Sequence, residues 1–228
     1  MIQRLTQVLG ILLVSCTGYG QNLITPFERS AGTATATYQE GISWWKALAA
    51  TYPGKIRMMT LGLTDSGEPL RLVVLSPGGN FNFNSLHSTG HCILLINNAI
   101  HPGEPDGVDA SMILARDLAQ GKLSLPPKVV LAIIPFYNIG GVLNRGSFSR
   151  ASQNGPVAYG FRGNAQNLDL NRDFIKCDSR NARSFARIFH LVNPDLFIDT
   201  HVSDGADYQH VMTLLTTQHD KLGPILGP

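Results

Sequence analysis

The sequence predicts an α/β protein, a three-layer α/β/α sandwich in which helices cover both faces of a mixed, mostly parallel sheet. Short apolar runs at Ile93–Ile96, Val129–Pro135 and Leu196–Thr200 have the composition of strands that are buried on both faces. Segments in which apolar residues recur at helical spacing separate these runs. Strands that alternate with helices in this way pack as a layered sheet.

The first half of the chain is expected to begin with a helix and a pair of strands. Thr35–Ala50 is predicted to be helical because its apolar side chains fall on one face. Arg57–Leu63 and Leu70–Leu75 flank the turn Asp65–Gly67, so we expect them to pair. The Asn-rich stretch Gly78–Ser88 is expected to be a polar loop.

The second half is expected to contribute two helices and a long loop. The helices are predicted at Asp109–Gln120, which is followed by the stop signal Gly121, and at Ser184–Leu191. The irregular stretch from Gly140 to Arg162 is expected to line a cleft. Val211–Leu215 is apolar and strand-like.

Length and composition indicate one folded domain. With 228 residues, of which 43% are hydrophobic, the chain can bury a sizeable core. A net charge of +2 gives no reason to expect nucleic acid as a partner. The apolar stretch Val8–Val14 is too short to span a bilayer, so no transmembrane span is expected. We divide the chain into residues 1–20, a signal peptide, 21–34, a loose leader, and 35–228, the folded domain.

The first twenty residues are typical of an export signal, with a basic start, a short apolar stretch and small residues before a cleavage point after Gly20. Export would place the protein in the periplasm or outside the cell. The alternative is a lipoprotein signal with a lipid anchor at Cys16, and an ordinary N-terminal helix is a third interpretation. Export permits disulfides, but we expect Cys92 and Cys177 to be free, packed thiols.

A candidate metal site follows two of the predicted strands. His101 and Glu104 lie three residues apart, just after Ile93–Ile96, and His201 ends a later apolar run. An imidazole, a carboxylate and a second imidazole form a ligand set typical of catalytic zinc. Each residue also has a simpler interpretation: His101 as a loop residue, Glu104 as a charge that favours the following helix, and His201 as a hydrogen-bonded strand end.

A second motif suits the binding of a carboxylate. In Asn171-Arg172 a planar cation follows an amide, and a guanidinium can hold a carboxylate by two parallel hydrogen bonds. The simpler interpretation is a turn-forming Asn171 and a solvated Arg172. A metal site and a carboxylate site in one domain suggest a peptidase that removes C-terminal residues.

These motifs resemble the zinc carboxypeptidases of the carboxypeptidase A and B type, from about Tyr38 to about Thr217. The resemblance implies that the three candidate ligands bind Zn²⁺. It also implies that Asn171 and Arg172 bind the free C-terminal carboxylate of a peptide substrate. Arg162 resembles the arginine that polarises the scissile carbonyl. Asp169 resembles the carboxylate that orients the first zinc histidine.

The tail of the chain departs from the family pattern. The family's general base is a glutamate several dozen residues beyond the third ligand, whereas only 27 residues follow His201 and none is Glu. Asp204 and Asp207 are so close to His201 that we expect them to order its loop. Residues 35–228 are therefore expected to be a partial zinc carboxypeptidase-like domain, incomplete at its C-terminus, that hydrolyses peptides poorly on its own.

The sequence leaves the tasks of the arginines and the exact reaction open. Arg145 and Arg150 compete with Arg162 for the role at the carbonyl, and Asp173 stands where relatives often carry Asn. A related zinc amidase or deacylase is a second candidate function. An inactive copy that binds zinc or peptide without turnover is a third.

The export signal gives a direct prediction. Mature protein is expected to begin at Gln21 in a periplasmic or secreted fraction. Mass spectrometry of the fractionated protein measures this N-terminus. A diacylated Cys16 would identify the lipoprotein alternative, and an intact Met1 in the cytoplasm would contradict both.

Overall fold

The computed structural model describes residues 23–203 and 209–226. The predicted signal peptide with Cys16, as well as Asp204 and Asp207, lies outside these residues. None of the helices among these residues combines the length and the hydropathy that a membrane span requires. Cys92 and Cys177 are free, as the sequence predicts.

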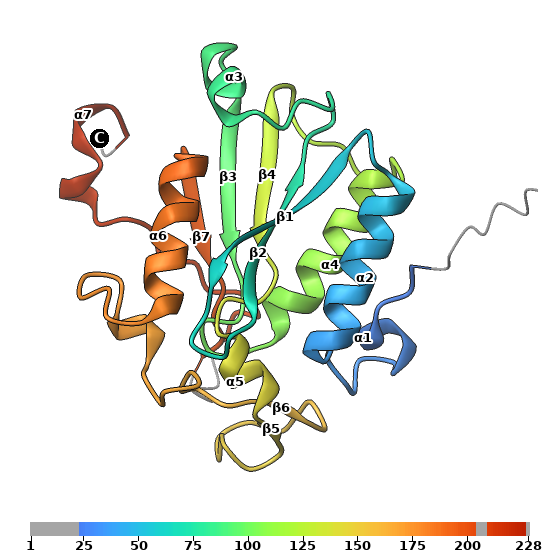
Figure 1. Cartoon of the computed structure of the whole chain (residues 1–228), viewed down its shortest axis with the longest axis vertical. Helices are drawn as coiled ribbons and strands as arrows, with labels where there is room; N and C mark the ends of the chain where they lie inside the picture. Colours follow the sequence, from blue (N-terminus) through green and yellow to red (C-terminus); the bar gives the residue numbers. More distant parts are fainter. Residues whose placement is uncertain (1–22, 204–208, 227–228) are drawn as a thin grey trace, which may run out of the picture.

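A five-stranded mixed sheet forms the centre of the molecule, in the order β1-β2-β4-β3-β7 (Figure 1). Its strands are β1 (Ile56–Leu63), β2 (Pro69–Leu75), β3 (Cys92–Asn97), β4 (Val129–Ile134) and β7 (Leu196–Asp199). Because β2 is antiparallel to both of its neighbours and β3 is parallel to both β4 and β7, only β2 runs against the common direction. The predicted mixed, mostly parallel sheet is confirmed.

Helices pack on both faces of this sheet, which gives the predicted three layers (Figure 1). One face carries α2 (Tyr38–Thr51) and α4 (Asp106–Ala119), and the other carries α3 (Phe83–Ser88) and α6 (Arg180–Val192). Alternate residues of β1, β2, β3 and β4 point into two separate apolar cores. Trp44 and Trp45 belong to the first core, where their rings pack edge to face.

Side-chain caps set the helix starts. Thr37 and Glu40 form a capping box at the start of α2, so this helix begins three residues later than predicted. Ser179 accepts the backbone N–H of Ala182 and starts α6, which ends at Asn193 in the left-handed conformation (φ 45°).

Smaller elements lie around the long loop and in the tail. They are α5 (Ile139–Leu143), the strands β5 (Arg145–Gly146) and β6 (Tyr159–Gly160), the 3₁₀ turns η1 (Leu170–Arg172) and η2 (His219–Lys221), and α7 (Gly223–Leu226). The strands β5 and β6 pair as a two-stranded antiparallel ribbon. This ribbon closes the loop that leads from α5 toward η1, so the loop has more order than its sequence indicates.

Three local predictions are wrong. The leader is not loose, because residues 26–29 form the helix α1 (Pro26–Arg29), which Thr25 caps. The Asn-rich stretch is not all loop, since Asn82 accepts the N–H of Ser85 and starts α3. Val211–Leu215 is highly exposed and has no strand partner among the described residues. An apolar run forms a strand only where another strand can pair with it.

Buried polar contacts fasten the leader to the domain. The indole nitrogen of Trp44 donates to the carbonyl of Leu23 at 3.1 Å. Arg116 of α4, which is only 8% exposed, donates to Glu28 Oε2 at 2.6 Å and also to the Leu23 carbonyl. The hydrogen bond from Arg116 is the largest cause that lowers the pKa of Glu28 to about 2.

Glu28→Gln is expected to lower the free energy of unfolding by about 1–3 kcal/mol at neutral pH, because it removes the charge from this pair. The pKa of Glu28 falls from 4.5 to about 2 in the folded chain. Its contribution is therefore complete above about pH 5 and is lost as the pH falls toward 2. Urea unfolding of both proteins across this range measures the difference. A difference that is as large at about pH 3 as at neutral pH would contradict the assignment.

Candidate metal centre and carboxylate-binding site

Two neighbouring strand ends bring the candidate ligands together. The strands β3 and β7 are parallel, and Asn97 at the end of β3 lies opposite Asp199 at the end of β7. From β3 the chain passes through Ala99, in the left-handed conformation (φ 58°), to His101. From β7 it continues directly to His201. The shared register therefore places both histidines at one edge of the sheet, as the sequence predicts for the carboxyl ends of parallel strands.

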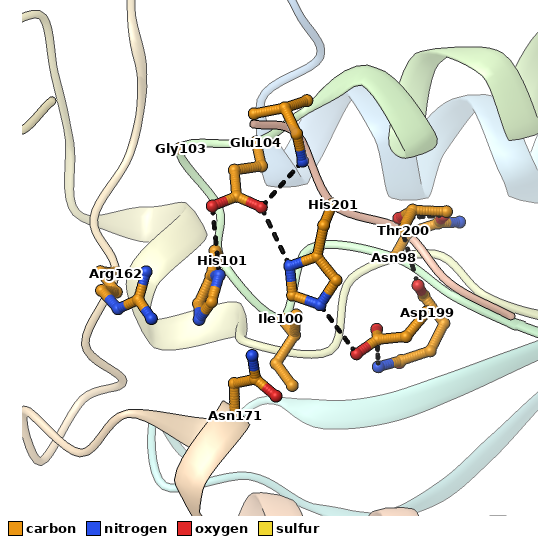
Figure 2. A network of polar contacts seen from close by, with 12 residues as sticks. Asn98, Ile100, His101, Gly103, Glu104, Arg162, Asn171, Asp199, Thr200 and His201 are labelled. Atoms are coloured by element: carbon orange, nitrogen blue, oxygen red, sulfur yellow. Dashed lines mark hydrogen bonds and ion pairs between the residues drawn. The ribbon is translucent and has the colours of Figure 1, made fainter. Parts of the chain in front are cut away.

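The three predicted ligands converge on one point (Figure 2). Donor atoms of His101, Glu104 and His201 all lie within 4.8 Å of one another. His101 Nδ1 lies 3.2 Å from Glu104 Oε1, and His201 Nδ1 lies 3.0 Å from Glu104 Oε2. His101 and Glu104 are buried, whereas the His201 side chain is about one-third exposed. The cluster is therefore open toward solvent on the His201 side.

A carboxylate binds the far nitrogen of each histidine. Asp169 Oδ1 lies 3.2 Å from His101 Nε2, and Asp199 Oδ2 lies 3.1 Å from His201 Nε2. The buried Asn97 donates from Nδ2 to Asp199 Oδ1 at 3.0 Å and fixes that carboxylate. With each Nε2–H donated to a carboxylate, each Nδ1 can offer a lone pair to a metal.

Sequence reasoning identified Asp169 but missed Asp199. Asp199 stands two residues before His201, and alternate residues of a strand share a face, so this spacing is a signal that could have revealed it. The hydrogen bond from His201 to Asp199 is visible beside the cluster in Figure 2.

The charges of the cluster suit a cation. Burial opposes ionisation of Glu104, but hydrogen bonds from His101, His201 and the Val202 N–H outweigh it and hold the Glu104 pKa well below its usual range. Asp199 first, and then Glu104, raise the pKa of His201 to about 9, so a metal ion that binds here must displace the proton from His201 Nδ1. Two imidazoles and a carboxylate with a fourth side open are the donors of a catalytic zinc site, so the residues present fit Zn²⁺.

Asp169 connects the metal cluster to the predicted substrate-binding residues. Its Oδ2 accepts hydrogen bonds from Arg162 Nε and Nη2, both at 3.0 Å. Its Oδ1 accepts the backbone N–H of Asn171 at 2.9 Å and so starts the turn η1. Arg172 is exposed, and its Nη1 donates to the Asn171 carbonyl at 2.9 Å. Figure 2 shows Arg162 and Asn171 near His101.

The structure separates the competing arginines. The guanidinium of Arg145 donates to three backbone carbonyls, one of them that of Ala158, and so anchors the loop. Arg150 donates from Nη1 to Glu104 Oε1 at 2.8 Å. Of the three arginines, Arg162 alone is bound to Asp169, and its side chain is substantially exposed, at 42%.

Asp173, which stands where relatives often carry Asn, has a structural task. Its Oδ2 accepts hydrogen bonds from the backbone N–H and the hydroxyl of Ser179, at 3.0 and 2.6 Å. Because Ser179 caps α6, these contacts fix the start of that helix.

A cavity of about 1110 Å³ opens beside the cluster. Pro105 and Val202, each next to a candidate ligand, form part of its wall. Residues between Gly140 and Arg162 form another part of its wall, among them Gln153 and Tyr159. The long loop therefore lines a cleft, as the sequence predicts.

The fold and this donor set define an α/β protein with a zinc-type metal centre at the carboxyl ends of its strands. Residues 41–196 match the family model of the zinc carboxypeptidases. This match covers more than half of the chain, so the chain belongs to the zinc carboxypeptidase family. No curated protein sequence matches the chain.

Solved structures of carboxypeptidases share the fold. A carboxypeptidase A candidate from Shewanella denitrificans is 21% identical with a TM-score of 0.58, over 75% of this chain and 41% of its own. A metallo-carboxypeptidase from Burkholderia cenocepacia is 20% identical with a TM-score of 0.57, over 82% and 48%. Bovine thrombin-activatable fibrinolysis inhibitor is 15% identical with a TM-score of 0.56, over 82% and 68%. The chain thus spans less than half the length of these two bacterial relatives.

The donor set predicts one zinc ion per chain in the wild-type protein. His101→Ala and His201→Ala are each expected to weaken zinc binding by more than about 100-fold, because even the loss of a residue that only orients a ligand costs about 10–100-fold. Metal analysis after dialysis against a weak chelator measures the zinc content. His190→Ala, at an exposed position on α6, is the control. Equal zinc in all four proteins would refute the site.

Proposed function

We propose that this chain carries the metal-binding and carboxylate-binding parts of an exported zinc carboxypeptidase, which hydrolyses the last peptide bond of peptides with a free C-terminus. The observation that carries this proposal is the position of Asp169. One oxygen of Asp169 contacts both the candidate ligand His101 and the Asn171 backbone, while the other holds Arg162. A single carboxylate therefore fixes the position of a candidate metal ligand relative to the proposed substrate-binding residues.

Arg172 and Asn171 bind the terminal carboxylate of the substrate in this proposal. A guanidinium that keeps some of its donors available can make charge-assisted, bidentate hydrogen bonds to a carboxylate. Arg172 is exposed and uses Nη1 for the Asn171 carbonyl, so Nη2 and Nε are the donors that we assign to the substrate. The Asn171 side chain adds an amide donor beside them.

Arg162 polarises the scissile carbonyl. Asp169 engages its Nε and Nη2, so Nη1 is the donor that we assign to the carbonyl oxygen. This arrangement holds a positive charge where negative charge develops on that oxygen, which lowers the barrier to attack. When zinc is bound, it acts as a Lewis acid and lowers the pKa of a bound water. His101, Glu104 and His201 hold the ion.

Recognition of the C-terminus is separable from turnover and tests the proposal directly. Arg172→Ala is expected to weaken binding of a peptide with a free C-terminus by roughly 10–100-fold, since a hydrogen bond to a charged group contributes about 1.5–3 kcal/mol. Binding of the same peptide with an amidated C-terminus is expected to change little. Isothermal titration calorimetry with the zinc-loaded 228-residue chain measures both affinities.

Arg187→Ala, at an exposed position on α6, is the matched control for loss of one positive charge. Its affinities for the two peptides are expected to equal those of the wild type. An equal loss of affinity for both peptides in Arg172→Ala would show that Arg172 has a structural role. Preference for N-acylated amino acids over peptides would favour the alternative amidase or deacylase.

A further inference from the structure

Each candidate metal ligand has its own charged partner, and the partner of Glu104 is a cation. Asp169 and Asp199 bind the two histidines, whereas Arg150 Nη1 donates to Glu104 Oε1 at 2.8 Å. The Arg150 side chain is only 11% exposed and that of Glu104 only 3%. A charge-assisted hydrogen bond in such a buried place is strong, because water competes little for either partner.

The surrounding chain is shaped to hold Arg150 in this position. Gly103 precedes Glu104, and a Cβ atom at Gly103 would lie 2.6 Å from Cδ of Arg150, so the arginine stem passes where only glycine leaves room. Gln153 donates from Nε2 to the Gly103 carbonyl at 2.7 Å. Tyr159 donates from its hydroxyl to the Arg150 carbonyl at 3.4 Å. Contacts on both sides thus fix the loop that carries Arg150 against the ligand loop.

We propose that Arg150 is a positioning residue that holds Glu104 for the metal, an inference that rests on the proposed function. Each oxygen of the Glu104 carboxylate has its own donor. Arg150 donates to Oε1, and the backbone N–H of Val202 donates to Oε2 at 3.1 Å. Neither of these donors comes from a histidine, so both remain available when a metal ion occupies the site. They therefore keep the plane of the carboxylate fixed in both states.

Arg150 and Arg162 then have different tasks. Arg162 is 42% exposed and bound to Asp169, so a substrate can reach it. Arg150 is enclosed and bound to a ligand, so it acts through Glu104 rather than on the substrate. Only a structure could separate the two, because the sequence places both arginines in the same irregular loop.

Two effects of Arg150 on zinc oppose each other. Its positive charge repels the ion, while its hydrogen bond orients the ligand and compensates the ligand's charge. We expect the orientation of Glu104 to outweigh the repulsion, because the charge of Arg150 is already paired with Glu104 at 2.8 Å. Residues that orient metal ligands typically contribute about 10–100-fold in metal affinity. Removal of Arg150 should therefore weaken zinc binding and not strengthen it.

The test compares zinc dissociation constants of the 228-residue chain and its variants, measured by competition with a chromogenic chelator. Arg150→Met keeps most of the stem over Gly103 but removes the donor, and it is expected to bind zinc about 10-fold more weakly. Arg150→Lys restores one donor and the charge, so it is expected to recover most of this loss. Arg183→Met, at an exposed position on α6, is the control and is expected to match the wild type.

The variants distinguish positioning from general loss of structure. Circular dichroism of the metal-free proteins is expected to show the same secondary structure in all four. Zinc affinity in Arg150→Met equal to or tighter than that of the wild type would overturn the inference and leave the proposed function standing. Failure of Arg150→Lys to recover any affinity would also overturn it. A wild-type chain that takes up no zinc would refute the proposed function and this inference together.

Discussion

The parallel pairing of β3 with β7 is the constraint on which the candidate site depends. It sets Asn97 opposite Asp199, and the two histidines follow these positions at the same edge of the sheet. Since His101 and His201 are far apart in the sequence, only this register brings their rings to a centroid distance of 5.1 Å. A register shift of one residue would turn Asp199 and His201 to the other face of the sheet.

The side chains around the cluster balance one another in charge. Three carboxylates, Glu104, Asp169 and Asp199, surround the two imidazoles, and Arg150 and Arg162 partly neutralise them. Buried carboxylates without such partners would take up protons, because the interior disfavours the charged form. Hydrogen bonds and ion pairs keep Asp169 and Glu104 ionised, with pKa values below their usual range. The negative charge of these ionised carboxylates favours a divalent cation in the cluster.

Patterns within short segments predicted the strands of the sheet and the edge at which the candidate ligands lie together. The apolar runs at β3 and β4 are buried, and that at β7 pairs with β3, so composition reveals these strands. The expected burial of β7 on both faces is wrong, because Leu196, Phe197 and Ile198 are 39–59% exposed. His101 and His201 lie within four residues of the ends of β3 and β7, and the carboxyl end of a strand is where α/β proteins bind ligands. The sequence therefore predicted the five strands of the main sheet, the helices α2, α4 and α6, and the place of the candidate metal cluster.

Contacts between segments that are far apart in the sequence could not be predicted from local patterns. The partner of Glu104 is Arg150, which lies 46 residues further along the chain in a loop without periodicity. The leader helix is held by Arg116, 88 residues from its partner Glu28. Val211–Leu215 shows the reverse case, since its apolar composition predicts a strand but no described strand pairs with it. Local composition indicates a preference for strand structure, whereas burial and pairing depend on the whole fold.

We propose that His101, Glu104 and His201 bind one zinc ion through two imidazole nitrogens and a carboxylate. Zinc-edge X-ray absorption of the zinc-loaded chain measures this ligand set directly. We expect two imidazole nitrogens at about 2.0–2.1 Å from the zinc ion and oxygen ligands at about 2.0–2.2 Å from it. Sulfur ligands at about 2.3 Å, or a zinc ion without imidazole ligands, would contradict the claim.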